Sequence, residues 1–147
     1  MAYRFSGEQH HLLVKEQQGV DLAEMMIRLA LGEDISAFDT PLLDDTAFVR
    51  PAVNLAIPLR TGKIGSVSGV EAVRAMPETL SCDQVHEPGD VISGQADYNH
   101  MLLRVNLVAQ DSAALRSAVE RVTGLIRVTA EDGTDMCLMR FCLPEAR

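Results

Sequence analysis

The sequence predicts an α+β fold in which a mostly antiparallel β-sheet carries helices packed on one face and is preceded by an N-terminal pair of helices. Two patterns predict this class. Apolar residues recur every three or four positions in residues 10–32 and in residues 113–126, as in amphipathic helices. Elsewhere, short apolar or alternating stretches end at Gly, Pro or Asp, which is typical of strands joined by turns. The 147 residues, 47% of them hydrophobic, are enough for one core.

Two helices are predicted at the start of the chain. The first covers residues 10–18 and ends at Gly19, because glycine readily adopts the left-handed conformation that terminates a helix. Asp21 is expected to cap the second helix, since its carboxylate can accept the free amide protons of the first turn. Gly32 ends this helix. Its apolar stripe consists of Leu22, Met25, Met26, Leu29 and Ala30.

A connection without a sustained period follows the second helix. The stretch "EDISAFDTPLLDD" contains five acidic residues together with Ser, Thr and Pro, a composition that indicates a solvated linker. It lacks the spacing and central glycine of a calcium-binding EF-hand loop. We therefore expect three parts, namely an N-terminal helical segment over residues 1–34, an acidic linker over residues 35–47, and an α+β domain over residues 48–147.

The remaining elements follow in order from their local patterns. A first strand in residues 48–60 has Val53, Leu55 and Ile57 on one face, and its prolines place it toward a sheet edge. Gly89, after a proline, marks a later turn. The other predicted elements are a strand after Gly62, a helix at 70–77, a strand at 79–87, a strand at 100–110, a helix at 113–126 capped by Asp111 or Ser112, and a closing hairpin at 125–143 with its turn at Asp132-Gly133.

The charge balance narrows the classes of partner. Thirteen basic and 21 acidic residues give a net charge of −8, so phosphate backbones and anionic membrane surfaces repel the molecule on average. No apolar run approaches the roughly 20 residues that span a bilayer, and the first residues lack the apolar centre of a secretion signal. We expect a cytoplasmic protein that binds neither nucleic acid nor membrane.

The cysteines and histidines do not form a recognisable site. Three cysteines without a CxxC pair support neither a disulfide framework nor a zinc site, and no neighbouring histidine or helix N-terminus activates them as nucleophiles. His10 and His11 diverge by about 100° on a helix and cannot readily share one metal ion. We therefore predict no catalytic residue and no metal site. The other residues concerned are Cys82, Cys137, Cys142, His86 and His100.

The stretch Arg60-Thr61-Gly62-Lys63 is the candidate binding surface. Two cations around a glycine turn can meet a carboxylate or a phosphate group. The alternative is that a basic hairpin turn serves solubility alone, and the residues leave both interpretations open.

Four fragments stand in a fixed order along the chain, namely "GVDLAEMMIRLALGE" and residues 58–64, 69–77 and 87–91. In this order and spacing they resemble the C-terminal part of the ATP-grasp carboxylate–amine ligases, in particular the L-amino-acid ligases and their biotin-carboxylase-like relatives. The first, "GVDLAEMMIRLALGE", is similar to the helix that follows the nucleotide site in those enzymes. The others resemble a "PPRSGxL" turn, a "GxEExRALPG" helix and an "xPGDxV" turn, and they are residues 58–64, 69–77 and 87–91. A final strand-to-helix step at residues 108–112 fits as well.

The resemblance also implies what this chain lacks. In the family, ATP and magnesium activate a carboxylate as an acyl phosphate, which an amine then attacks. The "E-x-N-x-R" signature that holds metal and phosphates falls on "MAYRFSG", where Ala2 occupies the asparagine position and Arg4 alone matches. We expect no cofactor for the chain by itself. By its family position, Arg4 is expected to contact a phosphate or carboxylate, with Ser6 and Gly7 offering backbone amides to the anion.

Two function hypotheses follow from these observations. The first is the C-terminal module of an ATP-grasp ligase, which completes a substrate pocket for an amino-acid-like ligand and is inert alone, with Arg60 and Lys63 near the mouth of that pocket. The second is a free-standing module that binds small molecules or serves assembly without catalysis. The apolar stripe at Met25, Met26 and Leu29 predicts association with a second copy or with an ATP-grasp subunit. An independent enzyme that uses the histidines or cysteines has little support.

Overall fold

The computed structural model of the protein describes residues 9–38, 50–94 and 100–141. The predicted ligand contacts Arg4, Ser6 and Gly7, most of the predicted linker and Cys142 lie outside these ranges. No helix within the described ranges is long and apolar enough to cross a membrane. The elements form an α+β fold with antiparallel sheets, which confirms the predicted class.

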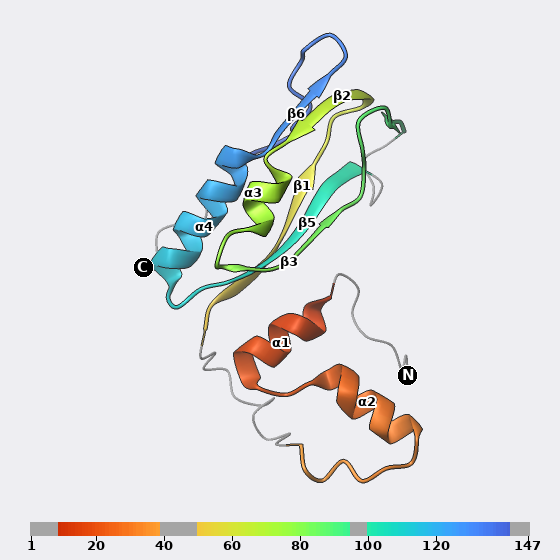
Figure 1. Ribbon diagram of the computed structural model, residues 1–147, viewed down its shortest axis with the longest axis vertical. Coiled ribbons are helices and arrows are strands. Elements are labelled where there is room, and N and C mark those ends of the chain that lie inside the picture. The colour runs from red at the N-terminus through yellow and green to blue at the C-terminus, as the bar shows by residue number, and fades with distance from the viewer. Residues whose placement is uncertain (1–8, 39–49, 95–99, 142–147) are drawn as a thin grey trace.

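The first two helices, α1 (His10–Gln18) and α2 (Leu22–Ala30), form a pair at one end of the molecule (Figure 1). As predicted, α1 ends at Gly19, which has a φ of 73°. The Asp21 carboxylate accepts the amide protons of Ala23 and Glu24, at 3.1 and 3.0 Å, and so caps α2. Of the two helices, α1 packs against the sheet, whereas α2 packs against α1.

Three strands form the first sheet in the order β1 (Ala52–Pro58), β5 (Met101–Val108) and β3 (Thr79–Gln84), all antiparallel. Val105 of β5 lies opposite Leu55 on one side and opposite Cys82 on the other. The proline-flanked strand β1 lies at the sheet edge, as its sequence predicts. The most apolar strand, β5, is central and is buried on both faces.

The second sheet places β2 (Gly62–Ser68) between β4 (Val91–Ile92) and β6 (Arg127–Ala130). Lys63 is opposite Val91, and Ile64 is opposite Ala130. This register brings the start of β2 beside the end of β6, although the two segments are more than 60 residues apart in the chain.

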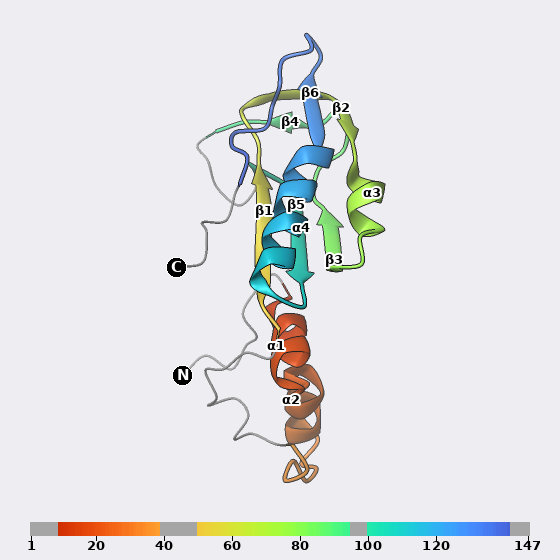
Figure 2. The ribbon, with the colours of Figure 1, turned by 90° about the vertical axis from the view of Figure 1, so that its left-hand side faces the viewer.

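Helices α3 (Val70–Arg74) and α4 (Ser112–Leu125) lie on the same side of the long strands (Figures 1 and 2). Asp111 caps α4 by accepting the amide proton of Ala114 at 2.8 Å. The predicted stripe of α4 is buried against the sheet and joins the main aliphatic core. It consists of Leu115, Ala118, Val119 and Val122.

The predicted closing hairpin is only half formed. Strand β6 and the turn at Asp132-Gly133 are present, but the described residues after the turn make two isolated bridges and no second strand. The Asp135 carboxylate accepts the amide proton of Cys137, and the amide of Leu138 donates to Pro58 of β1. The returning segment therefore crosses from β6 to β1 and links the two sheets.

Candidate functional site

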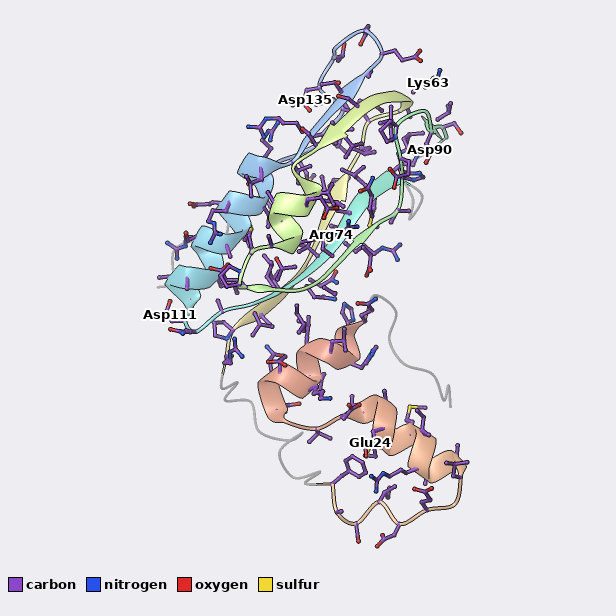
Figure 3. All side chains as sticks on the ribbon, in the orientation of Figure 1. Glu24, Lys63, Arg74, Asp90, Asp111 and Asp135 are labelled. Atoms are coloured by element: carbon purple, nitrogen blue, oxygen red, sulfur yellow. The ribbon has the colours of Figure 1, made fainter. Side chains whose placement is uncertain are left out.

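A surface hollow of about 410 Å³ lies between the turn before β2 and the loop after β6. The turn contributes residues 60–63, and the loop contributes residues 130–132 and 134–136. The amide of Arg60 donates to the carbonyl of Met136 at 2.8 Å, which fixes the two walls against each other. The hollow lies at the end of the α+β body opposite Asp111, as the positions of Lys63 and Asp135 show in Figure 3.

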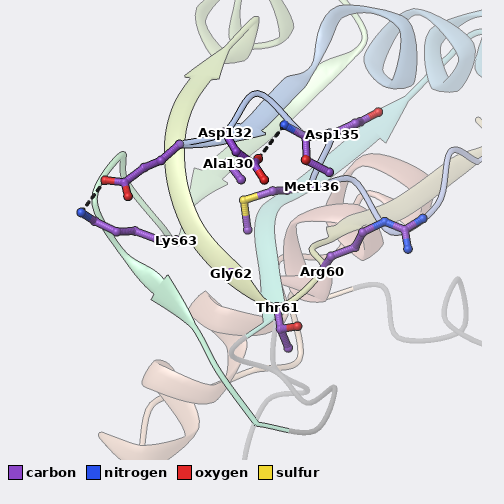
Figure 4. A pocket seen from close by; sticks show the side chains of 10 residues that line it. Arg60, Thr61, Gly62, Lys63, Ala130, Asp132, Asp135 and Met136 are labelled. Carbon is purple, nitrogen blue, oxygen red and sulfur yellow. Dashed lines mark hydrogen bonds and ion pairs between the residues drawn. The ribbon is translucent and has the colours of Figure 1, made fainter.

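The two predicted cations extend in opposite directions from the turn (Figure 4). The ammonium group of Lys63 pairs with the carboxylate of Glu131 across the hollow, with Nζ and Oε1 2.5 Å apart. The guanidinium of Arg60 points away from this pair and, within the described residues, has no acidic partner. The two cations therefore lie on separate parts of the surface. Lys63 is paired with a carboxylate, and Arg60 is not.

Acidic side chains shape the loop wall of the hollow. Asp132 and Asp135 accept the backbone amide protons of Thr134 and Cys137, both at 2.9 Å. These bonds are the main reason why the pKa of each carboxyl lies below its usual value of 3.8. Asp135 also accepts a hydrogen bond from the guanidinium of Arg140, whose other terminal nitrogen donates to the carbonyl of Thr123 in α4. The loop is thereby anchored to the helix layer.

Two further hollows adjoin the first. One, of about 680 Å³, shares Lys63 and Glu131 with it and continues toward Gly89. The other, of about 420 Å³, shares Arg60 and Thr61 and reaches the buried ring of His100. The three hollows thus form a row, in which Lys63 lies between the first and the larger hollow and Arg60 lies between the first and the hollow near His100. Sequence reasoning identified both cations but missed the loop acids Glu131, Asp132 and Asp135, because their closeness to the turn depends on the β2–β6 register.

The structure describes the surroundings of His86, His100, Cys82 and Cys137. The ring of His86 contacts Asp90 at 3.2 Å, and the ring of His100 contacts the carbonyl of Ser93 at 3.2 Å. Burial raises the pKa of the thiols of Cys82 and Cys137, which leaves less thiolate near neutral pH than in a free cysteine.

An apolar surface on α2 is the second notable feature outside the core. All nine residues of α2 are described, and none is buried. Ile27 and Leu29 are 61% and 58% exposed, and Leu31, directly after the helix, is 68% exposed. Ile27 and Leu31 are four positions apart and share one side of the helix, whereas Leu29 lies on another side. Exposed apolar residues on more than one side of a helix end favour contact with another molecule.

Comparison with known protein families gives a match over the central part of the chain. The model of the L-amino acid ligase C-terminal domain 2 matches residues 55–131, which is more than half of the chain. The matched segment runs from within β1 to the residue after β6 and includes the turn wall of the hollow together with Ala130 and Glu131 of the loop wall. The comparison with curated proteins finds no match. The resemblance to ATP-grasp ligases noted in the sequence is confirmed, and the chain belongs to the L-amino acid ligase C-terminal domain 2 family.

Proposed function

We propose that this chain acts as the C-terminal module of an ATP-grasp carboxylate–amine ligase, where it completes a substrate pocket without catalysing the reaction alone. The family match over residues 55–131 carries the proposal, because this segment contains the whole turn that lines the hollow and the start of the lining loop, Ala130 and Glu131. ATP and magnesium are held by the other part of the complete enzyme. The module supplies shape and charge for the substrate.

The charges of the hollow suit an amino-acid-like ligand. Arg60 and Lys63 offer positive charge to a carboxylate, and Arg60 is able to bind it through two nitrogens. The loop acids Asp132 and Asp135 offer negative charge to an ammonium group. The pKa values of both carboxyls lie below the usual value, so the two groups stay ionised at neutral pH. Binding and orientation are the roles that this arrangement supports.

The apolar surface of α2 supports docking of the module onto an ATP-grasp body in the cytoplasm. Ile27, Leu29 and Leu31 are each more than half exposed in the isolated chain, and covering them removes apolar area from water. A homo-oligomer is the alternative occupant of this surface. The relation to biotin carboxylase stays a prediction.

The test combines the full chain with an ATP-grasp body that carries the "E-x-N-x-R" signature and lacks its own C-terminal domain. We expect the mixture to form ADP in the presence of particular L-amino acids, whereas each component alone does not. Formation of ADP by this chain alone would contradict the proposal.

Two substitutions of exposed apolar residues test whether ADP formation depends on docking through α2. Leu29→Gln is expected to lower the ADP formation of the mixture at least ten-fold, since a buried amide without a partner weakens an apolar contact by more than about 1.4 kcal/mol. Val91→Gln is the matched control, because Val91 is 65% exposed on β4, outside α2. It should leave ADP formation unchanged, and both variants should unfold at the wild-type denaturant midpoint.

A second candidate function is a non-catalytic module for small-molecule binding or assembly, derived from the same family. The exposed apolar residues of α2 favour it, since they are able to serve assembly whether or not a ligase is present. Self-association that Leu29→Gln abolishes, together with no effect of the chain on any ATP-grasp body, would favour this candidate over the first.

A further inference from the structure

The ion pair between Lys63 and Glu131 stands on the boundary between two hollows. The hollow of about 410 Å³ continues from the pair toward Arg60 and Met136, and the hollow of about 680 Å³ continues toward Gly89. Both linings contain Lys63 and Glu131. The two side chains therefore form a bridge of opposite charges between the neighbouring spaces.

This bridge is open to water. The side chain of Lys63 is 49% exposed and that of Glu131 is 63% exposed. Ion pairs of this kind contribute little to stability, because water solvates the separated charges well and pairing restricts two long side chains. Another carboxylate can therefore replace Glu131 at small cost, whereas the ammonium group keeps an anionic partner in either state.

The backbone beneath the bridge is held independently of it. Ile64 is paired with Ala130 across β2 and β6. The close approach of the strands continues at Gly65, where a Cβ atom would lie 2.7 Å from the carbonyl oxygen of Ala130. The amide of Ala130 donates to Thr134 at 2.9 Å and closes the loop. Exchange of the partner of Lys63 therefore requires rotation of the Glu131 side chain and no movement of the strands.

We propose that Glu131 is an internal competitor that occupies Lys63 until a ligand carboxylate displaces it, and that its release joins the two hollows into one groove. The inference deepens the proposed function and rests on it in one respect, namely that this surface binds a carboxylate ligand. No covalent step is involved. Lys63 exchanges one carboxylate partner for another, and Glu131 turns to the solvent.

The test uses acetate as the probe, because it carries a carboxylate and little else. Backbone amide signals of the full chain are followed during a sodium acetate titration, with sodium chloride at the same ionic strength as the reference. In the wild type, we expect weak and saturable shifts at Lys63, Ala130 and Glu131. Lys63→Gln should abolish these shifts, since it removes the cation.

Glu131→Gln is the decisive variant. It removes the competing charge and keeps the shape of the side chain, and we expect acetate to bind up to about five-fold more tightly, the factor set by the strength of an exposed ion pair. Glu71→Gln is the matched control. It changes the net charge equally and breaks an exposed pair of the same length, with Arg74, outside both hollows. It should leave the affinity for acetate at the wild-type value.

Two results would overturn the proposal. Equal affinities of Glu131→Gln and Glu71→Gln for acetate would show that Glu131 does not compete for Lys63. The absence of acetate-dependent shifts in every variant would show that Lys63 does not exchange its partner. Neither result depends on an ATP-grasp body, so a failure here is distinguishable from a failure of the ADP assay.

Discussion

At the scale of single residues, Gly69 has the least room for a Cβ atom among the glycines that the structure describes. It precedes α3 with a φ of 90°, a conformation that residues with a side chain rarely adopt. A Cβ atom at this position would overlap the carbonyl oxygen of Leu125, at the end of α4. The start of one helix and the end of another therefore meet with no room for a methyl group.

Gly69→Ala is expected to lower the free energy of unfolding by about 2 kcal/mol or more, because it combines backbone strain with a backbone overlap. Urea denaturation measures the change. Gly133→Ala is the control, since Gly133 has a φ of 84° but open space around it, and strain alone should cost about 1 kcal/mol. Equal losses for the two variants would mean that the contact between α3 and α4 relaxes freely.

At the scale of elements, a row of polar side chains crosses the first sheet. The amide of Asn54 on β1 donates to the Asn106 oxygen on β5 at 2.8 Å, and the Asn106 nitrogen donates to the hydroxyl of Ser81 on β3 at 2.9 Å. Asn106 is 1% exposed. A buried amide that is satisfied from both sides favours one register of the three strands, because a shift by one residue would remove its partners.

Asn106→Ala is expected to lower the free energy of unfolding by roughly 2–3 kcal/mol, since it leaves a cavity and removes partners of Asn54 and Ser81. Asn54→Ala should cost only about 1 kcal/mol, because Asn54 lies on the edge strand and is partly exposed. Chemical denaturation of both variants checks the order. A larger loss for Asn54→Ala would contradict a register role for Asn106.

At the scale of the whole molecule, the aspartates make the stability depend on pH in the acidic range. The pKa lies below the usual value of 3.8 in each of five aspartates. In four of them, the main cause is a backbone amide that donates to the carboxylate in a turn, and in Asp21 the main cause is the ammonium group of Lys15. The five are Asp21, Asp34, Asp90, Asp132 and Asp135.

The sign of the pH effect follows from these shifts. A carboxyl whose pKa is lower in the folded state stabilises the fold above the unfolded pKa, and this contribution is lost as the pH falls through the folded pKa. The free energy of unfolding should therefore decrease as the pH falls from about 5 to below 3.8. The free energy of unfolding of Asp135→Asn should decrease less steeply over this pH range. An identical pH profile for the variant and the wild type would contradict the stabilising role of the Asp135 carboxylate. Urea denaturation at successive pH values measures both.

Much of the local structure could be predicted from the sequence because it depends on nearby residues. Gly19 ends α1 and Asp21 caps α2 through bonds within one turn of helix. The stripe of α4 around Val119 is buried as its spacing predicts. The returning part of the closing hairpin was predicted wrongly, because its partners lie on β1 and not only on β6.

Some residues of the candidate site could be predicted from the sequence, and others only from the structure. The sequence alone identified Arg60 and Lys63, since two cations on either side of a glycine form a recognisable sequence pattern. It did not identify Glu131 as the partner of Lys63, because 68 residues separate the two. That this surface binds an amino-acid-like ligand stays a prediction.

The sequence by itself thus determined the fold class, most elements and the family, all of which follow from short-range periodicity and from motifs in order. The tertiary structure alone decided which strands pair, that the two cations diverge, and that the loop after β6 forms the second wall of the hollow. The physical reason is that strand pairing and side-chain direction depend on contacts between distant segments, which compete across the whole chain and leave no local pattern.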